Sequence, residues 1–349
     1  MIRDGFKLPW GHSRPPLAAS PPPPRCLSPI QETALESEVR DLLFKGAISE
    51  LPPNPDPGFY VRLFVVPKAS GGWRPILDCS PLNKFLRKEK FKLESPSQIR
   101  QSIQEGDWAT SVDLKDAYFH ILIHRSFRRY LRFVWRGRIF QFNALPFGLS
   151  LAPFVFTKIV RAMITLLRMD NVRIRVYLDD WLILAQSSHL CRLRTSKVLQ
   201  LCSHLGFQIN FLKCDLTPSQ SFQFLGMVFH TVPMLVFPSQ ERVDRLFLLL
   251  NFLRQASFAS ARQLSALLGL MESLAPVIPS GKLWKRPLQR GLRRRWTQLS
   301  DSWEVRIPLR TWFHRATADW SDPQSLLKGV PIVPPPFEVA LYMDASTTG

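Results

Sequence analysis

The chain has 349 residues, of which 46 are Lys or Arg and 27 are Asp or Glu, so its formal net charge is +19. At roughly 150 residues per domain this length suits two to three domains, and an apolar content of 46% excludes a wholly disordered basic protein. The apolar runs are far shorter than the roughly 20 residues that span a bilayer, and the five scattered cysteines argue against a disulfide framework or a zinc site. We therefore expect an intracellular protein of the cytoplasm or nucleus, with no membrane contact and a polyanion as its leading partner.

Hydrophobic periodicity predicts a series of helices and strands in the first half of the chain. The proline-rich residues 1–29 show no periodicity and predict a flexible or extended lead-in. The predicted elements that follow are a helix over Gln31–Lys45 ended by Gly46, strands over Tyr60–Val66 and Trp73–Leu77 around a turn at residues 69–72, a strand over Thr110–Leu114, a hairpin over Tyr130–Phe142 turning at Arg136-Gly137, and a helix over Phe154–Arg168.

The second half begins with two strands and becomes mainly helical. Residues 276–336 are basic and interrupted by prolines. The predicted elements are strands over Arg173–Leu178 and Trp181–Ala185, a helix over Ser196–Leu205, a strand pair within Phe222–Val228, helices over Val243–Leu253 and Ala261–Leu274, and a strand over Glu338–Tyr342.

The positive charge is concentrated in two segments. Residues 121–176 hold eleven Lys or Arg and one acid, a net charge of +10. Residues 281–315 hold ten Lys or Arg and two acids, a net charge of +8, and interleave four tryptophans with their arginines. Cationic side chains can bind a phosphate backbone, and aromatic rings beside them can stack on bases. Solvated charges and tryptophans of the core explain the same composition.

Three carboxylates carry the chemistry that the sequence indicates. Tyr177-Leu178-Asp179-Asp180 lies between two apolar strands, so we expect Asp179 and Asp180 at the tip of a β-hairpin with side chains on opposite faces. Asp113 ends another predicted strand, whose apolar residues indicate burial. Acidic residues at a hairpin tip are often turn formers, but carboxylates that emerge from a buried sheet need counter-ions.

Two Mg²⁺ ions would neutralise these carboxylates, because hard divalent ions take oxygen ligands. Two ions roughly 4 Å apart can hold both the attacking 3′-oxygen and the leaving pyrophosphate of an in-line displacement. With basic segments in the same chain, this pattern predicts nucleotidyl transfer with Mg²⁺, for which Mn²⁺ can substitute.

Six blocks of residues follow one another in an order that matches a known family. They are Val66-Pro67-Lys68 with Trp73-Arg74-Pro75-Ile76-Leu77-Asp78 and Leu82-Asn83; Asp113 to Tyr118; Leu145-Pro146-Phe147-Gly148-Leu149-Ser150; Tyr177 to Asp180; Leu205-Gly206-Phe207 with Asn210 and Lys213; and Phe224-Leu225-Gly226. Over about residues 30–349 the chain resembles the retroelement reverse transcriptases. The amino-acid sequences of its blocks are most similar to those of DIRS-type retrotransposons and then to those of gypsy-type elements.

The resemblance implies an α+β fold, the right-hand polymerase of fingers, a palm with an antiparallel sheet and a helical thumb, followed by the truncated start of an RNase H-like domain. The implied divisions are a proline-rich flexible lead-in at 1–29, fingers and palm at 30–232, a helical and basic thumb or connection at 233–335, and the first RNase H strand at 336–349. Asp344 matches the first metal-binding carboxylate of RNase H. The remaining ligands would lie past Gly349, so RNase H activity is expected only of a longer protein.

The resemblance also implies roles for individual residues. Asp113 and Asp179 should bind both metal ions, with Asp180 as a supporting ligand. Lys213 is a candidate general acid for the leaving pyrophosphate, although an exposed helix-end lysine is an equal interpretation. The incoming triphosphate should be clasped by Lys68 and Arg74 and met by the backbone amides of Asp116 and Ala117.

Further residues are implied to shape the nucleotide and primer sites. Tyr118 should lie against the sugar and leave no room for a 2′-hydroxyl, which favours deoxynucleotides; a plain core tyrosine is its alternative. Phe147 and Gly148 should shape the pocket at the templating pair, where glycine permits close backbone approach. The primer terminus should be held by four residues that a core strand would explain equally well: Phe224, Leu225, Gly226 and Met227.

The implied function is RNA-directed and DNA-directed DNA polymerisation by a retrotransposon enzyme, with a template–primer of RNA or DNA and dNTPs as partners. An RNA-dependent RNA polymerase also uses a palm with paired aspartates and is the first alternative. The second alternative is an inactive or domesticated fragment that only binds nucleic acid.

Overall fold

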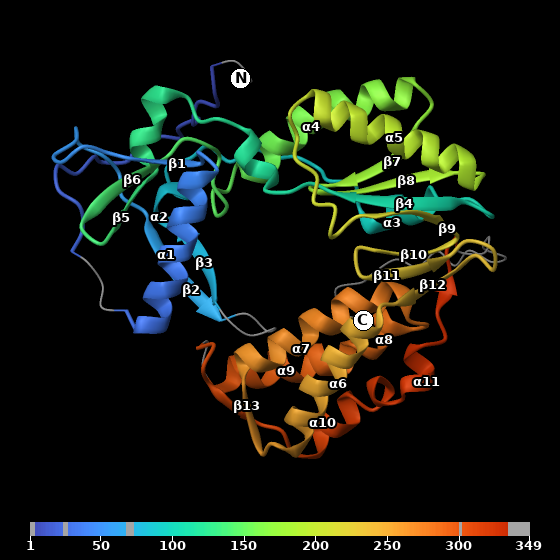
Figure 1. Cartoon of the computed structure of the whole chain (residues 1–349). Coiled ribbons are helices and arrows are strands. Elements are labelled where there is room, and N and C mark those ends of the chain that lie inside the picture. The colour runs from blue at the N-terminus through green and yellow to red at the C-terminus, as the bar shows by residue number, and fades with distance from the viewer. Residues whose placement is uncertain (1–3, 24–26, 68–72, 300–301, 334–349) are drawn as a thin grey trace. The chain divides into compact units, whose positions relative to one another are not determined.

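The computed structural model describes residues 4–23, 27–67, 73–299 and 302–333, with the backbone alone at residues 67 and 73–75. Helices and strands alternate through the first half of these ranges (Figure 1). The elements are α1 (Pro29–Phe44), β1 (Ile48–Glu50), β2 (Arg62–Pro67), β3 (Trp73–Asp78), α2 (Ser80–Asn83), α3 (Pro96–Gln101), β4 (Trp108–Asp113), η1 (Ala117–His120), η2 (Arg125–Tyr130), β5 (Arg132–Trp135), β6 (Arg138–Phe142), α4 (Ala152–Met169), β7 (Arg173–Tyr177) and β8 (Asp180–Ala185).

The second half contains short strands followed mainly by helices. The elements are α5 (Ser188–His204), β9 (Asp215–Ser219), β10 (Ser221–Phe224), β11 (Met227–His230), β12 (Leu235–Pro238), α6 (Gln240–Gln255), β13 (Phe258–Ser260), α7 (Ala261–Leu274), η3 (Ala275–Val277), α8 (Gly281–Trp284), α9 (Arg286–Leu299), β14 (Arg306–Pro308), α10 (Arg310–Ala316), η4 (Asp319–Ser321), α11 (Pro323–Leu326) and β15 (Val330–Pro331). The mixture of helices and antiparallel pairs is the predicted α+β class.

Capping groups explain where two of the predicted helices begin. At α1 the Ser28 side chain accepts a hydrogen bond from the Gln31 amide, and the Gln31 side chain accepts one from the Ser28 amide. Ser260 and Gln263 form the same reciprocal pair at the start of α7. Each pair satisfies two amides that have no partner within the helix, so the boundary is fixed locally.

The sheet that positions the predicted carboxylates has the strand order β7-β8-β4-β9. Strands β4 and β9 are antiparallel, with a register shift between Ala109 and Ser111. Helices α4 and α5 lie over one face of this sheet in Figure 1. Residues 181–185 of β8 are all buried, which agrees with the apolar run that predicted the strand.

Four smaller sheets complete the described structure. Their strand orders are β1-β6-β5, β2-β3, β10-β11-β12-β15 and β13-β14. The predicted hairpin over residues 130–142 is confirmed as β5 and β6, with left-handed backbone at Arg136 (φ 47°) and Gly137 (φ 72°). This two-residue turn matches the right-handed twist of the strands that it joins.

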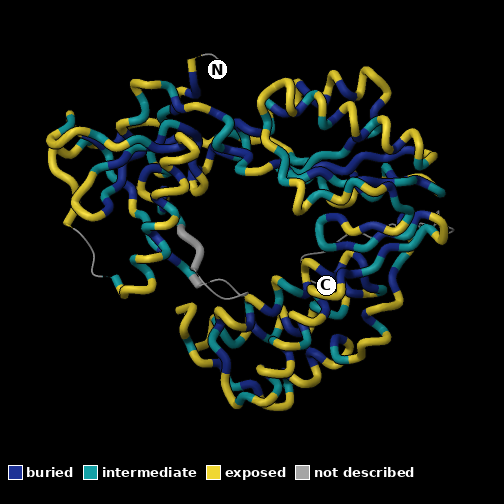
Figure 2. Tube along the Cα trace, viewed as in Figure 1, coloured by how far each residue is buried: buried dark blue, intermediate teal, exposed yellow. Residues whose placement is uncertain are grey.

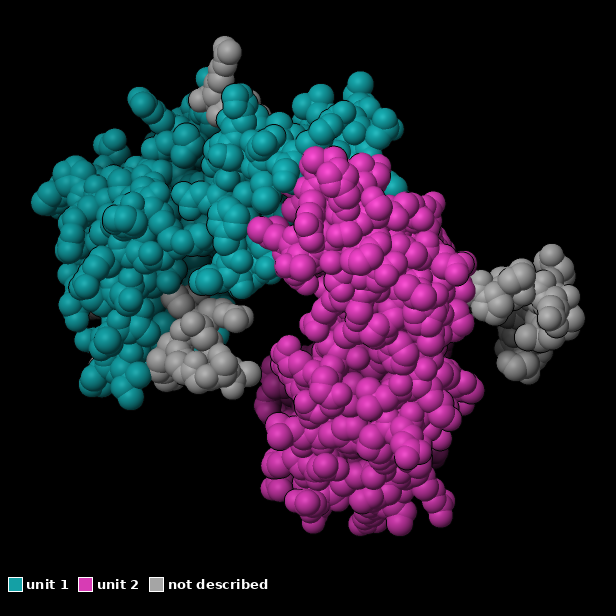
Figure 3. All heavy atoms as spheres, turned by 45° about the vertical axis from the view of Figure 1, so that its right-hand side comes forward, with its two compact units in different colours: residues 1–93, 112–181, 196–214 teal, residues 94–111, 182–195, 215–349 magenta. Residues whose placement is uncertain are grey.

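The chain divides into two compact units, each made from three separate stretches of sequence (Figure 3). The first unit contains residues 1–93, 112–181 and 196–214, and the second contains residues 94–111, 182–195 and 215–349. All three predicted catalytic aspartates and Lys213 belong to the first unit.

Each unit has its own buried core, seen as dark segments in Figure 2. In the first unit Phe133 and Phe140 stack across β5 and β6 with ring centroids 5.4 Å apart. In the second, α6, α7, α9 and α10 pack around fully buried residues that include Leu264, Leu267 and Phe313. These helices carry the apolar stripe that predicted α6 and α7.

Of the two states predicted for the lead-in, flexible or extended, the described part is extended, and it is packed against the fold. Phe6 forms a parallel bridge with Ile123, and Trp10 forms an antiparallel bridge with Leu86. Phe6 and Leu8 are buried. Proline blocks a helix but not an extended strand, so the segment lies along the fold without showing periodicity.

One predicted boundary differs from the structure. Helix α5 begins at Ser188, eight residues before the predicted start at Ser196, whereas α8, α9, α10 and α11 lie within residues 233–335, which were predicted as a helical thumb or connection. The predicted turn at 69–72 and the predicted strand at 338–342 lie outside the described residues. No helix in the described ranges is both long enough and apolar enough to cross a membrane.

Candidate functional site

The predicted hairpin tip is confirmed in the backbone. Strand β7 ends at Tyr177, Leu178 and Asp179 form the turn, and β8 begins at Asp180. Leu178 has a left-handed backbone (φ 56°). The indole of Trp181 is fully buried and donates from Nε1 to the Leu178 carbonyl at 3.0 Å. Trp181 therefore supports the turn by packing.

Backbone pairing brings Asp113 beside this turn. Asp113 is the last residue of β4, and the next amide, that of Leu114, donates to the Asp179 carbonyl at 3.0 Å. A turn after α5 approaches from the other side, where the Asn210 amide donates to the Asp113 carbonyl at 2.9 Å. Asp113 thus lies between two backbone segments that fix its position.

The carboxylates are close enough for the charge of Asp113 to act on the other two. Burial, followed by the charges of Asp179 and Asp113, raises the pKa of Asp180 to about 6, against an opposing effect of Lys213. Burial also raises the pKa of Asp179, with Asp113 adding to the rise and Lys213 lowering it. Desolvation of the partly buried carboxylates is the main physical cause, and repulsion between like charges adds to it. The structure therefore brings together Asp113, Asp179, Asp180 and Lys213, as predicted.

The donor chemistry of this group suits a hard divalent cation. Carboxylate oxygens are the ligands that Mg²⁺ prefers, and a cation would relieve the repulsion that raises these pKa values. Within the described ranges, however, no three His, Cys, Asp or Glu side chains are already arranged around a common point as a metal-binding group. The residues fit a cation by chemical type and mutual proximity, and the ligand geometry is not preformed.

The turn that carries Lys213 is anchored to the end of β4. The Lys213 amide donates to the Asn210 carbonyl at 2.9 Å, and Asn210 is itself bonded to Asp113. The next residue, Cys214, places its sulfur 3.3 Å from the Asp113 amide nitrogen, which donates to it. The Lys213 side chain is exposed, so its ammonium is accessible beside the carboxylates.

Tyr118 and Phe147 meet next to the carboxylates. Their ring centroids are 4.7 Å apart, and Tyr118 also contacts Phe156 at 5.7 Å. Tyr118 is only 9% exposed, whereas Phe147 is 49% exposed. Burial, followed by the charge of Asp179, raises the pKa of Tyr118 to about 12. The two residues predicted to contact the nucleotide are thus adjacent, and one of them presents an apolar face to solvent.

Gly148 occupies a position that a side chain would obstruct. Its φ is 94°, and a Cβ there would lie within 3.0 Å of the Leu77 carbonyl oxygen. Asn83 holds the same loop, because its Nδ2 donates to the Gly148 carbonyl at 3.0 Å and its Oδ1 accepts from the Ser150 amide at 2.9 Å. Gly148 is thus packed against the end of β3, and its role at the templating pair stays a prediction.

Lys45 is a residue at this site that the sequence did not indicate. Its Nζ lies 2.9 Å from Oδ2 of Asp116 and 2.5 Å from Oδ2 of Asp41. Burial lowers the pKa of Lys45, but hydrogen bonds to Asp41 and Asp116 outweigh it and leave that pKa raised. Asp116 has a left-handed backbone (φ 52°), so Lys45 holds the carboxylate of a strained turn just before Ala117.

His120 is a second residue that pattern reading missed. Its Nε2 accepts the Gln208 amide at 2.9 Å, so its Nδ1 carries the proton and donates to the Ala117 carbonyl at 3.2 Å. Burial lowers the pKa of His120, while Ala117 and Asp116 act in the opposite direction. The neutral ring therefore joins the turn before Tyr118 to the turn that leads to Lys213.

The remaining predicted residues are placed less completely. Arg74 lies in β3 opposite Val66, and its side chain is outside the described part, as are Lys68 and Asp344. Phe224 and Met227 pair across β10 and β11 with buried side chains. Leu225 (φ 50°) and Gly226 (φ 73°) form the turn between β10 and β11. This turn is the more accessible part of the predicted primer site, and it belongs to the second unit.

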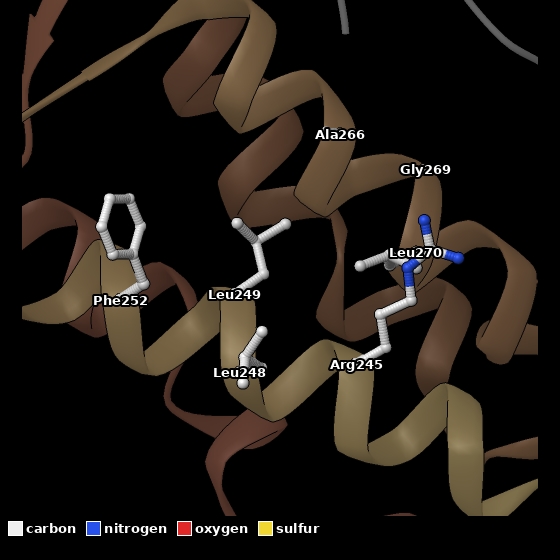
Figure 4. A pocket seen from close by; sticks show the side chains of 7 residues that line it. All are labelled: Arg245, Leu248, Leu249, Phe252, Ala266, Gly269 and Leu270. Carbon is white, nitrogen blue, oxygen red and sulfur yellow. The ribbon is translucent and has the colours of Figure 1, made fainter. Parts of the chain in front are cut away.

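Two surface hollows lie apart from the carboxylates. One, of about 530 Å³, is lined by α6 and α7 with Phe252, Leu249 and Arg245 among its residues (Figure 4). The other, of about 420 Å³, is lined by α4 and α5 and includes Asp170 and Lys197. The lining of neither includes the three aspartates.

Comparison with known proteins agrees with these features. Residues 66–229 match the family described as reverse transcriptase (RNA-dependent DNA polymerase). The Tf2-3 and Tf2-4 transposon polyproteins of Schizosaccharomyces pombe are each 27% identical to the chain over 276 residues, which is 78% of the chain and 20% of the polyprotein. The chain thus spans about a fifth of the length of these relatives.

Solved structures share the fold. The foamy viral protease–reverse transcriptase with an RNA/DNA hybrid aligns with a TM-score of 0.71 and 18% identity, over 90% of this chain and 39% of that one. Its counterpart with double-stranded DNA aligns with a TM-score of 0.70 and 17% identity, over 90% and 52%. At this identity the likeness establishes a shared α+β fold.

Proposed function

Because residues 66–229 are a reverse transcriptase domain, we propose that the chain is the polymerase part of a retrotransposon polyprotein. It adds dNTPs to the 3′-hydroxyl of a primer on an RNA or DNA template. The observation that carries the proposal is the group of Asp113, Asp179 and Asp180, in which Asp113 adds to the raised pKa of the other two, directly beside Tyr118.

In the proposed mechanism the carboxylates act as ligands. Asp113 and Asp179 would hold the divalent cations, with Asp180 as a supporting ligand. Bound Mg²⁺, or Mn²⁺ in its place, would stabilise the charge on the attacking 3′-oxygen and on the leaving pyrophosphate. Lys213, whose charge already acts on Asp179 and Asp180, donates the proton that the pyrophosphate needs.

The nucleotide is positioned by residues on both sides of the carboxylates. The amides of Asp116 and Ala117 meet the triphosphate, together with Lys68 and Arg74 of the fingers hairpin. Tyr118 faces the sugar, and its contact with Phe147 at 4.7 Å supports a rigid wall there. A wall of this kind excludes a 2′-hydroxyl, which favours dNTPs over NTPs and argues against an RNA-dependent RNA polymerase.

The partners and setting follow from the same proposal. The template–primer is a duplex of RNA with DNA or of DNA with DNA, and the turn at Leu225-Gly226 contacts the primer. The retroelement is of the DIRS type, with the gypsy type second, and it acts in the cytoplasm or nucleus.

The test is primer extension on an RNA template with Mg²⁺ or Mn²⁺, comparing Asp179→Asn with the unaltered chain. Loss of a metal ligand removes several kcal/mol of charge stabilisation, so we expect extension to fall by at least about a hundredfold. Asp170→Asn is the matched control, because Asp170 is an exposed carboxylate of the same unit, paired with Lys197 at 2.6 Å.

The outcomes separate the proposal from its alternatives. Extension by Asp179→Asn at the rate of the control would overturn the assignment of the site. Extension with NTPs in preference to dNTPs would favour the RNA polymerase. Nucleic-acid binding without extension under any metal condition would favour an inactive or domesticated fragment.

A further inference from the structure

The strand that carries Asp113 extends beyond the strand with which it pairs. Strands β4 and β9 are paired as far as Ser111 and Asp215. The residues before Asp215 do not continue β9, because residues 211–213 form a turn. In an antiparallel pair the amide and the carbonyl of one residue face the same neighbouring strand. The amide and carbonyl of Asp113 therefore need other partners on the side where β9 does not extend.

The turn that precedes β9 supplies those partners. The Asn210 amide donates to the Asp113 carbonyl at 2.9 Å. The Asp113 amide donates to Sγ of Cys214 at 3.3 Å. The same sulfur lies 3.9 Å from the Asp113 carbonyl oxygen, to which the thiol can donate. The thiol of Cys214 thus takes the place that a backbone carbonyl would have in a continuous sheet.

Bonds on both sides of this contact hold the two segments together. Before it, the Asp215 amide donates to Oγ of Ser111 at 3.3 Å. After it, Leu114 forms an antiparallel bridge with Ile209. Cys214 therefore lies in a segment that is attached to β4 at both ends, which restricts how far its sulfur can move from Asp113.

The position of the Asp113 carboxylate depends on this backbone. Leu114 is already held on the other side, where its amide donates to the Asp179 carbonyl at 3.0 Å. Asp113 is half-buried, so an amide without an acceptor there would cost free energy or draw the strand end toward water. Because the side chain of a strand residue follows its backbone, movement of the strand end would displace the carboxylate from Asp179.

We infer that Cys214 is a positioning residue for the carboxylate of Asp113. Its sulfur contacts neither cation nor substrate, and it acts by fixing the backbone from which the carboxylate projects. The inference rests on the proposed function for the cation that Asp113 would bind, whereas the contact between Cys214 and Asp113 rests on the hydrogen bond alone. A thiol that only fills space is the alternative that the test must exclude.

The test is the binding of Mn²⁺ by the full chain without nucleotide, with free Mn²⁺ measured by electron paramagnetic resonance. Cys214→Val removes the acceptor at roughly the same side-chain volume. We expect Mn²⁺ affinity to fall by about two- to tenfold, which corresponds to one hydrogen bond. Cys214→Ser keeps an acceptor and should recover part of the affinity. Urea unfolding checks that each variant is folded, and Cys214→Ala replaces Cys214→Val if valine prevents folding.

Cys202→Val is the matched control. Cys202 is a buried thiol of the same unit, and among the described residues no hydrogen bond joins it to Asp113. The control should bind Mn²⁺ as the unaltered chain does. An affinity of Cys214→Val equal to that of the control would overturn the inference, as would a serine variant that binds no better than the valine variant.

A second background shows whether Cys214 acts through Asp113. Asp113→Asn keeps the backbone amide but loses the carboxylate, so Cys214→Val should change Mn²⁺ affinity little in this background. A general structural effect of valine would instead lower the affinity by the same factor in both backgrounds, and that result would overturn the inference.

The same measurements separate this inference from the proposed polymerase. A chain that extends no primer but loses Mn²⁺ affinity in Cys214→Val, and only while Asp113 is present, would overturn the polymerase and support the role of Cys214. A chain that extends primers and loses Mn²⁺ affinity in Asp113→Asn but not in Cys214→Val would overturn the role of Cys214 alone. Unchanged affinity in Asp113→Asn would overturn both the ligand assignment and the positioning role.

Discussion

Replacing Gly148 with alanine tests whether close backbone approach selects glycine beside Phe147. Two costs add at this position. The φ of 94° is a left-handed conformation, which costs a residue with a Cβ about 1 kcal/mol or more. The added Cβ would also fall within 3.0 Å of the Leu77 carbonyl oxygen, a backbone atom that cannot rotate away. Overpacking of this kind costs about 1–3 kcal/mol.

Gly137→Ala separates the two costs. Gly137 has a φ of 72° but no atom within 4 Å of its Cβ position, so alanine at this position costs free energy only through its backbone conformation. We expect its free energy of unfolding to fall by about 1 kcal/mol and that of Gly148→Ala by about 2–4 kcal/mol. Both glycines belong to the first unit.

Equilibrium unfolding in urea measures both variants, with the slope against urea checked for constancy. Primer extension on the same samples should fall for Gly148→Ala and stay near normal for Gly137→Ala, because only the former displaces the loop that carries Phe147. If Gly148→Ala costs no more than Gly137→Ala, contact with Leu77 is not the reason for glycine, and the reasoning fails.

Three further predictions concern the same site. His120→Gln should flatten the pH dependence of stability. Burial holds the folded pKa of His120 below 6.5, so the unfolded chain binds more protons than the folded chain as pH falls below 6.5, and the unaltered protein loses up to about 1.4 kcal/mol per pH unit more than the variant. Urea titrations from pH 7.5 to 5 measure this loss, and parallel curves for the two proteins would contradict it. Lys45→Ala should lower the free energy of unfolding by about 1 kcal/mol and raise KM for dNTPs more than it lowers kcat, because it frees the Asp116 turn. Lys45→Arg should recover part of the stability and part of the KM, and a change in kcat alone would argue against a positioning role. Tyr118→Val should raise ribonucleotide incorporation by about tenfold or more in a competition between dNTPs and NTPs, and unchanged sugar discrimination would remove the steric role.

Local patterns predicted those parts of the fold whose signals are local. Helix α7 begins and ends at its predicted residues, because a capping pair and an apolar stripe both lie within it. The hairpin tip at Asp179 was predictable since two apolar strands leave room for only a two-residue turn. The grouping of Asp113 with Asp179 and Asp180 followed from strand ends and from the resemblance to a family.

Features that depend on distant partners were not predictable in the same way. The ion pair of Lys45 with Asp116 joins the end of α1 to a turn far along the chain, and neither residue type nor spacing indicates it. The first half of α5 was missed because Leu190 and Leu193 are exposed and blur the apolar stripe. Helix α9 was missed because Pro287 resembled a break, although it lies in the first turn, where proline has no partner to lose.

The packed lead-in bears on how the protein can be divided for expression. The matched segment starts at residue 66, yet Phe6 and Leu8 are buried, and Phe6 exchanges backbone hydrogen bonds with Leu122 and His124, which lie inside that segment. A fragment trimmed to the matched boundaries would expose to solvent the apolar surface that Phe6 and Leu8 cover, together with backbone amides that have lost their partners. Such a fragment invites aggregation through a surface that the intact chain never shows, so the sequence homology limits are a poor guide to where this protein can be cut.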